Sequence, residues 1–103
     1  MRAMTGMSEE DDLTSLRVKI EGFVQAVGFR NFVIEKAKAF NLDGWVRNRS
    51  DGTVEALVSG STKSVEAFVG ACTQGPAGSK VTSIDLHKAE PPEEKGFHRR
   101  PSV

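Results

Sequence analysis

The sequence predicts a small α+β domain in which two helices cover one face of an antiparallel β-sheet. Stretches in which every second residue is apolar are typical of half-buried strands, and they alternate with stretches in which apolar residues recur every three or four positions, as in amphipathic helices. Turn-forming residues separate these stretches. At 103 residues the chain has the length of one such domain.

The first strand and the first helix are expected on either side of a glycine-containing stretch. Apolar and charged residues alternate over 16–21, and this strand runs directly into residues 22–28. Apolar side chains recur at helical spacing over 29–40, namely Phe29, Val33, Ala37 and Phe40. Asn41 is expected to end the helix, because asparagine is the usual substitute for glycine in the left-handed position after a helix.

A hairpin and a second helix are expected next. Strands beginning at Trp45 and covering 53–59 flank residues 49–52, Arg-Ser-Asp-Gly, whose composition is that of a hairpin turn. Ser61 is the expected N-cap of a helix that stops at 74–76, Gln-Gly-Pro. The apolar stripe of this helix consists of Val65, Phe68, Val69 and Cys72.

The end of the chain is expected to add a fourth strand and a tail. The strand covers 81–88, and prolines in the stretch 91–94 break regular structure before the tail, 96–103. The tail is either a solvated basic terminus or an edge strand. The order strand, helix, strand, strand, helix, strand matches the ferredoxin-like, split βαβ arrangement.

Composition limits the classes of function and location. Fourteen basic and fourteen acidic side chains cancel, so no overall field attracts nucleic acid or a membrane. The single cysteine excludes an internal disulfide and a multi-cysteine zinc site, and suits a reducing compartment. Residues 1–14 are acidic where a signal peptide would be basic and then apolar, so we expect a disordered leader, a domain over 15–103 and a cytoplasmic protein.

The stretch 22–30, GFVQAVGFR, has the properties of an anion site. It joins a strand to a helix N-terminus, where backbone N–H groups lack intrahelical acceptors and the helix dipole is positive. Glycines let the backbone curl around an anion, and Arg30 in the first helical turn offers a planar fork of donors. The glycine spacing is neither that of a dinucleotide fingerprint nor that of a Walker loop, so a nucleotide is not indicated.

Two separated segments resemble one known family. Residues 22–30 and residues 44–54, GWVRNRSDGTV, are similar to the two signature segments of acylphosphatase, including the spacings G-x-V-Q-x-V-x-F-R and G-W-V-x-N-x-x-D-G-x-V. The resemblance continues to about residue 88. It implies a ferredoxin-like fold and the hydrolysis of the carboxyl-phosphate bond of acyl phosphates without a metal or other cofactor.

The resemblance also implies roles for individual residues. The backbone amides of Val24, Gln25, Ala26, Val27, Gly28 and Phe29 would hold the phosphoryl oxygens. Arg30 would neutralise their charge and Asn48 would hold the attacking water. An asparagine is too weak a base to accept the proton, so the substrate phosphate would accept it. These few groups suffice because a carboxylate is a good leaving group and phosphoryl transfer depends mainly on positioning and charge stabilisation.

Ala26 is a departure from the family, which usually has glycine there. If this position requires a positive φ, a non-glycine residue costs about 1 to 2 kcal/mol. If the phosphate touches its Cα, the methyl group intrudes. In either case the methyl group would weaken the site without abolishing it.

Several of these residues also fit roles outside a catalytic site. Asn48 alone fits a turn residue, Gln25 either orders the loop or is solvated, and Trp45 fits a core or platform residue better than a ligand-stacking group. Cys72 fits a buried inert thiol, and two histidines, His87 and His98, lack the spacing of metal ligands.

The preferred function is a monomeric acylphosphatase acting on a small-molecule acyl phosphate, with no nucleic acid or membrane partner. The alternative is a non-catalytic ferredoxin-like module that binds an anion or RNA through the same loop. Such an RNA-binding domain would normally expose aromatic residues on its central strands, and the first strand has none among its outward residues, Arg17, Lys19 and Glu21.

Overall fold

The computed structural model describes residues 12–25 and 28–103. Its elements are β1 (Leu13–Phe23), α2 (Phe29–Ala39), β2 (Asp43–Asn48), β3 (Val54–Ser61), α3 (Thr62–Gln74), β4 (Lys80–Lys88) and β5 (Phe97–Arg99). Most of the expected leader lies outside the described residues. The strand β1 already begins at Leu13, which pairs with Ser61, so the last two residues of the expected leader belong to the strand.

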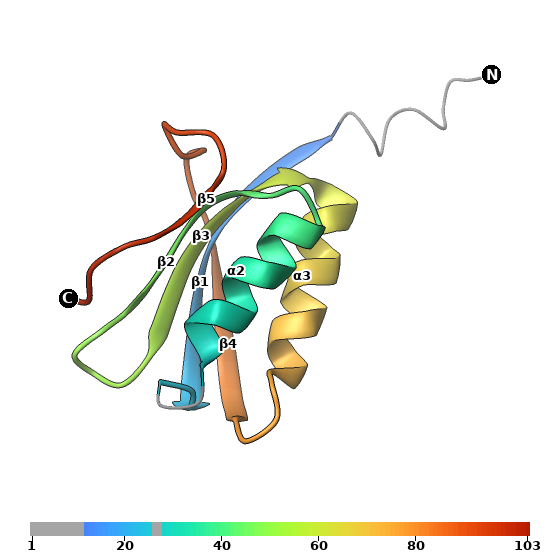
Figure 1. Cartoon of the computed structure of the whole chain (residues 1–103). Coiled ribbons are helices and arrows are strands. Elements are labelled where there is room, and N and C mark those ends of the chain that lie inside the picture. Colours follow the sequence, from blue (N-terminus) through green and yellow to red (C-terminus); the bar gives the residue numbers. More distant parts are fainter. Residues whose placement is uncertain (1–11, 26–27) are drawn as a thin grey trace.

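The strands form one sheet in the order β4-β1-β3-β2-β5. Both helices cover the same face, as Figure 1 shows, which confirms the ferredoxin-like α+β prediction. The four expected strands pair antiparallel, as predicted, and β5 adds a parallel pairing with β2 that the prediction did not include. The sheet is therefore mixed, and no helix of the described part of the chain covers its other face, here called the outer face (Figure 1).

The fifth strand comes from the tail and realises the edge-strand alternative. It has three residues, too few to show a period in the sequence. Backbone pairing continues beyond it, since the N–H of Arg100 donates to the carbonyl of Val46 and the N–H of Val103 donates to that of Asn48. The tail thus lies beside β2 as far as Asn48.

The core lies between the sheet and the helices. The alternating apolar residues of β1 and β3 face the apolar stripes of α2 and α3, where Phe29 and Phe68 are the largest fully buried side chains. Each such burial contributes about 2 kcal/mol to folding. Cys72 belongs to this core, as predicted, and burial raises the pKa of its thiol to about 12.

The helix ends have the predicted chemistry. Asn41 has a φ of 60°, and the next N–H, of Leu42, donates to the carbonyl of Ala37, which closes the end of α2. Ser61 caps α3, since its hydroxyl accepts from the N–H of Ser64 at 3.2 Å. Neither helix among the described residues is long and apolar enough to cross a membrane.

Candidate active site at the β1–α2 loop

Gly22 positions the entrance to the β1–α2 loop. The pairing of β1 with β4 shifts register between Glu21 and Gly22, and Gly22 has a φ of 131°. A Cβ there would stand 1.9 Å from the carbonyl oxygen of Lys80. Only glycine fits this close approach, which directs the chain from the sheet toward α2.

Gln25 ties the loop to the β2–β3 hairpin. Its half-buried amide nitrogen donates to the carbonyl of Arg49 at 2.7 Å and to that of Thr53 at 2.8 Å. Of the two roles left open by the sequence, ordering of the loop is the one observed. The side chain uses its donors on the protein, so it holds the loop in place against the hairpin that carries Asn48.

The loop ends in an uncapped helix N-terminus. Gly28 is the N-cap of α2 and adopts the left-handed conformation, φ 73° and ψ 24°, while a Cβ there would meet nothing within 4 Å. Glycine is therefore favoured at this position by the left-handed backbone conformation and not by lack of space for a side chain. Among the described residues no side chain caps the helix, and its first turn contains no acidic residue. The first N–H groups of α2 and its positive dipole end are left available for an anion.

Arg30 lies in this first turn. It is half-buried, and its guanidinium forms no hydrogen bond or ion pair with another residue of 12–25 or 28–103. The helix that carries it packs against β2 and β5. A positive charge therefore stands at a helix N-terminus beside the strand of Asn48.

Asn48 is the last residue of β2 and lies on the helix-covered face. Side chains alternate along a strand, and Val46 and Gly44, two and four residues earlier, are buried on the side of the helices. The side-chain oxygen Oδ1 of Asn48 is buried and has no hydrogen-bond partner among the described residues. A buried carbonyl oxygen without a donor costs about 1 to 3 kcal/mol, so this atom is suited to receive a donor from outside the chain.

The hairpin next to Asn48 is held rigid. The Asp51 carboxylate accepts from the hydroxyl of Thr53 at 2.6 Å and from its N–H at 3.0 Å. These two hydrogen bonds hold the pKa of Asp51 below its ordinary value. The carbonyl of Thr53, one of the acceptors of Gln25, is thereby fixed.

The outer face directly behind the hairpin carries a charge cluster around Glu55. Its carboxylate accepts from Arg47 at 2.8 Å and from Arg49 at 2.9 Å, and the Nε of Arg17 stands 3.7 Å away. Burial raises the pKa of Glu55, but the hydrogen bonds from the two arginines outweigh burial and leave the pKa below its ordinary value. The cluster backs β2 and β3 without contributing to the helix-covered face.

The remaining predicted site residues divide into two groups. The side chains of Val24 and Phe29 are buried in the core, so only their backbones are available for a ligand. Ala26 and Val27 lie outside the described residues.

His87 and His98 are exposed, as expected. Among the described residues, no group of three or more His, Cys, Asp or Glu side chains could hold a metal ion.

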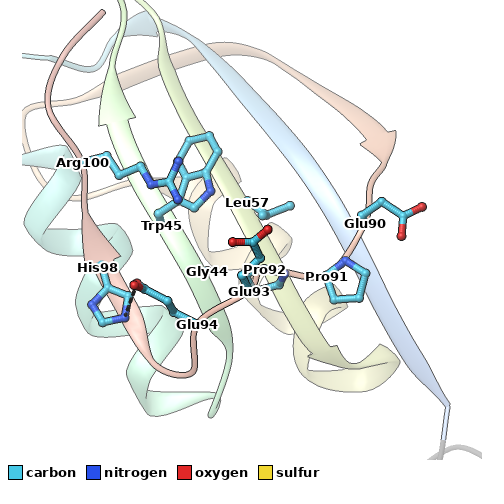
Figure 2. Close-up of a pocket in the computed structure, with 10 residues that line it drawn as sticks. All are labelled: Gly44, Trp45, Leu57, Glu90, Pro91, Pro92, Glu93, Glu94, His98 and Arg100. Carbon is cyan, nitrogen blue, oxygen red and sulfur yellow. Dashed lines mark ion pairs between the residues drawn. The ribbon is translucent and has the colours of Figure 1, made fainter.

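A separate cavity lies on the outer face and is shown in Figure 2. Its volume is about 330 Å³, and it is bounded by Trp45, Leu57, Arg100 and the segment 90–94. Trp45 stands between two guanidiniums, those of Arg47 at 4.8 Å and Arg100 at 4.9 Å from its ring centre, so it serves as a platform on this face. None of the proposed catalytic residues lines this cavity.

Comparison with known proteins decides the family. The family model described as acylphosphatase matches residues 16–99. The chain belongs to the acylphosphatase family. This confirms the resemblance seen in the two segments, and the chain is accordingly a hydrolase of acyl phosphates.

Acylphosphatases of known sequence and structure cover nearly the whole domain. An acylphosphatase of Acidiphilium cryptum is 49% identical over 81 residues, which are 79% of this chain and 89% of the relative. One of Rhodospirillum rubrum is 43% identical over 88% of this chain and 100% of its own length. The crystal structure of the Bacillus subtilis acylphosphatase matches with a TM-score of 0.80 at 39% identity, over 86% of this chain and 99% of that one.

Two features of the site were not foreseen from the sequence. The acceptors of Gln25 are backbone carbonyls 24 and 28 residues away, for which the sequence carries no signal. Arg99 on β5 donates to the side-chain oxygen of Asn31, the residue after Arg30. Both contacts depend on how distant strands are brought together.

Proposed function

We propose that the chain hydrolyses acyl phosphates and that the backbone amides between residues 24 and 30 hold the phosphoryl group of the substrate. The uncapped N-terminus of α2 and the absence of an acidic residue in its first turn support this placement. Arg30, half-buried in that turn, supplies the positive charge for the phosphoryl oxygens. Charge stabilisation and positioning are the main requirements of phosphoryl transfer.

Asn48 is proposed to hold the attacking water. The single observation that carries this role is its buried Oδ1, which has no hydrogen-bond donor among the described residues. A water molecule bound there would donate one hydrogen to Oδ1 and present its oxygen to the phosphorus. Gln25 supports the arrangement, because it fixes the loop to the hairpin that follows Asn48.

The reaction balances without any further group. The water oxygen forms a bond to phosphorus, the bond between phosphorus and the acyl oxygen breaks, and the carboxylate departs with the electron pair. The proton of the water passes to a phosphoryl oxygen, since neither the Asn48 amide nor the Arg30 guanidinium is a base. The products are a carboxylate and inorganic phosphate.

The test is hydrolysis of benzoyl phosphate by the purified protein in ¹⁸O-labelled water containing a chelator. Attack at phosphorus places the label in inorganic phosphate, which is the expected result. Label in benzoate would mean attack at the carbonyl carbon and would reject the proposed site. Absence of turnover by the folded protein, repeated with Ala26→Gly, would favour a non-catalytic anion-binding module if the variant also stays inactive.

A further inference from the structure

Two adjacent arginines near the end of the chain lie on opposite faces of the sheet. The guanidinium of Arg99 donates to the side-chain oxygen of Asn31 on α2. The guanidinium of Arg100 stacks on Trp45 on the outer face, 4.9 Å from the ring centre (Figure 2). Because neighbouring strand residues face opposite ways, only Arg99 is directed to the helix-covered face where Arg30 and Asn48 lie.

Asn31 makes this contact relevant to the site. It follows Arg30 and is the third residue of α2, in the turn whose N–H groups have no intrahelical acceptor. The contact bridges 68 positions of the sequence. It therefore fastens the phosphate-facing turn of α2 to the sheet through β5.

The strand register places Arg99 close to Asn48. Arg99 stands opposite Val46 in the parallel pairing of β5 with β2, and Asn48 lies two residues farther along β2. With about 4.8 Å between strands and about 3.3 Å per residue, the Cα atoms of Arg99 and Asn48 are about 8 Å apart. An extended arginine side chain spans much of that distance.

The charge of Arg99 is not compensated locally. Within residues 12–25 and 28–103, its guanidinium forms no ion pair with an acidic side chain, and α2 has no acidic residue in its first turn. A guanidinium has five N–H donors, of which the Asn31 contact uses one. The positive charges of Arg99, Arg30 and the helix dipole therefore add at one end of α2.

We propose that Arg99 is a second arginine of the phosphate site, a positioning residue supplied by the C-terminal strand. It holds the first turn of α2 through Asn31 and adds a positive charge that favours a doubly charged phosphoryl group. The identity of the phosphate site rests on the proposed function. The effect on binding acts on the ground state and the transition state alike, so it changes KM and leaves kcat nearly unchanged.

The experiment is titration of the protein with inorganic phosphate, the expected product, by calorimetry at low ionic strength. Arg99→Gln should raise the dissociation constant about three- to tenfold, because a unit charge near the site is only partly screened. Arg99→Lys keeps the charge and should restore most of the affinity. Arg100→Gln removes the same charge one residue away on the other face and should change the affinity less than twofold.

Two further measurements separate tethering from charge. Asn31→Ala removes the acceptor and keeps the arginine, so its effect should be intermediate. In 0.5 M KCl the difference between wild type and Arg99→Gln should shrink, since salt screens the charge. With an acyl phosphate, Arg99→Gln should raise KM by the same factor at unchanged kcat.

The outcomes distinguish this inference from the proposed function. Equal phosphate affinities for Arg99→Gln and Arg100→Gln, with both variants folded, would overturn the role of Arg99 even if hydrolysis is normal. Phosphate binding that depends on Arg99 in a protein without turnover would overturn hydrolysis and keep the inference. Failure of the wild type to bind phosphate would overturn the proposed phosphate site and the role of Arg99, and the turnover measurement would decide hydrolysis separately.

Discussion

Asn48 and Glu55 lie on neighbouring strands but on opposite faces of the sheet, and they differ in whether their polar atoms have hydrogen-bond partners. Glu55 has three arginine side chains within 3.7 Å of its carboxylate. Asn48 has a buried carbonyl oxygen without any partner among the described residues. On the outer face, the buried carboxylate of Glu55 is paired with side chains of the protein itself. On the helix-covered face, Oδ1 of Asn48 remains available to accept a hydrogen bond from a ligand.

This difference indicates where a ligand should bind. A buried group whose hydrogen bonds are complete contributes to stability, and a buried group left incomplete costs stability unless a ligand completes it. Variants on the outer face should therefore change the free energy of unfolding. Variants on the helix-covered face, at the end of α2 and β2, should change binding and turnover.

The largest effect is expected from Arg30→Ala. Removal of the charge in the first turn of α2 should lower kcat/KM about 100- to 1000-fold, with a raised KM as well as a lowered kcat, because the charge acts on the ground-state phosphate too. Initial rates with benzoyl phosphate measure both constants. Lys38→Ala, at the far end of the same helix, is the matched control, and an equal loss there would contradict a local role.

Glu55→Gln should affect stability and spare activity. The neutral amide cannot compensate the surrounding arginines, so the free energy of unfolding should fall by about 1 to 3 kcal/mol, as for other hydrogen bonds to charged groups. Urea denaturation measures this change. Glu66→Gln, an exposed position on α3, should change it by less than 0.5 kcal/mol, the usual limit for surface substitutions. A loss of turnover without a loss of stability would break the contrast between the two faces.

The pH dependence of stability gives a smaller, directional test. The pKa of Glu55 in the folded protein lies below its ordinary value of 4.5, so the unfolded chain binds this proton more readily than the folded one. The stabilisation from Glu55 is therefore complete above about pH 4.5 and is lost as the pH falls through the folded pKa. Between pH 5 and 3, the unfolding free energy of Glu55→Gln should decline less than that of the wild type.

The smallest effect is expected from Ala26→Gly. Glycine removes a methyl group from the loop and restores the residue that the family usually has, so activity should stay the same or rise. Steady-state kinetics with benzoyl phosphate measure it. A clear loss of activity in a folded variant would mean that the loop geometry differs from that of the family.

Most of the fold could be predicted from residues that are neighbours in the sequence. The left-handed Asn41, the cap at Ser61 and the hairpin at 49–52 are each determined by residues next to one another, and each was predicted from them. The strand β5 could not be predicted, because three residues show no periodicity and their pairing depends on β2, about 50 positions earlier. The parallel edge is a tertiary effect.

The candidate site was predictable as a list of residues and less so as an arrangement. Arg30 and Asn48 stand in two spaced segments whose pattern is visible in the sequence. What fastens these segments is not visible there: Gln25 reaches backbone carbonyls of the hairpin, and Arg99 reaches Asn31. Carbonyl acceptors carry no residue identity, and an exposed arginine gives no sign of the face to which its strand will turn it.

The most direct test of the open acceptor is Asn48→Ala, with turnover and phosphate affinity measured on the same preparation. If Oδ1 holds the attacking water, kcat should fall about 100-fold while KM and phosphate affinity stay nearly unchanged and the free energy of unfolding does not fall. An unchanged kcat, or a loss of phosphate binding equal to the loss of turnover, would contradict that role.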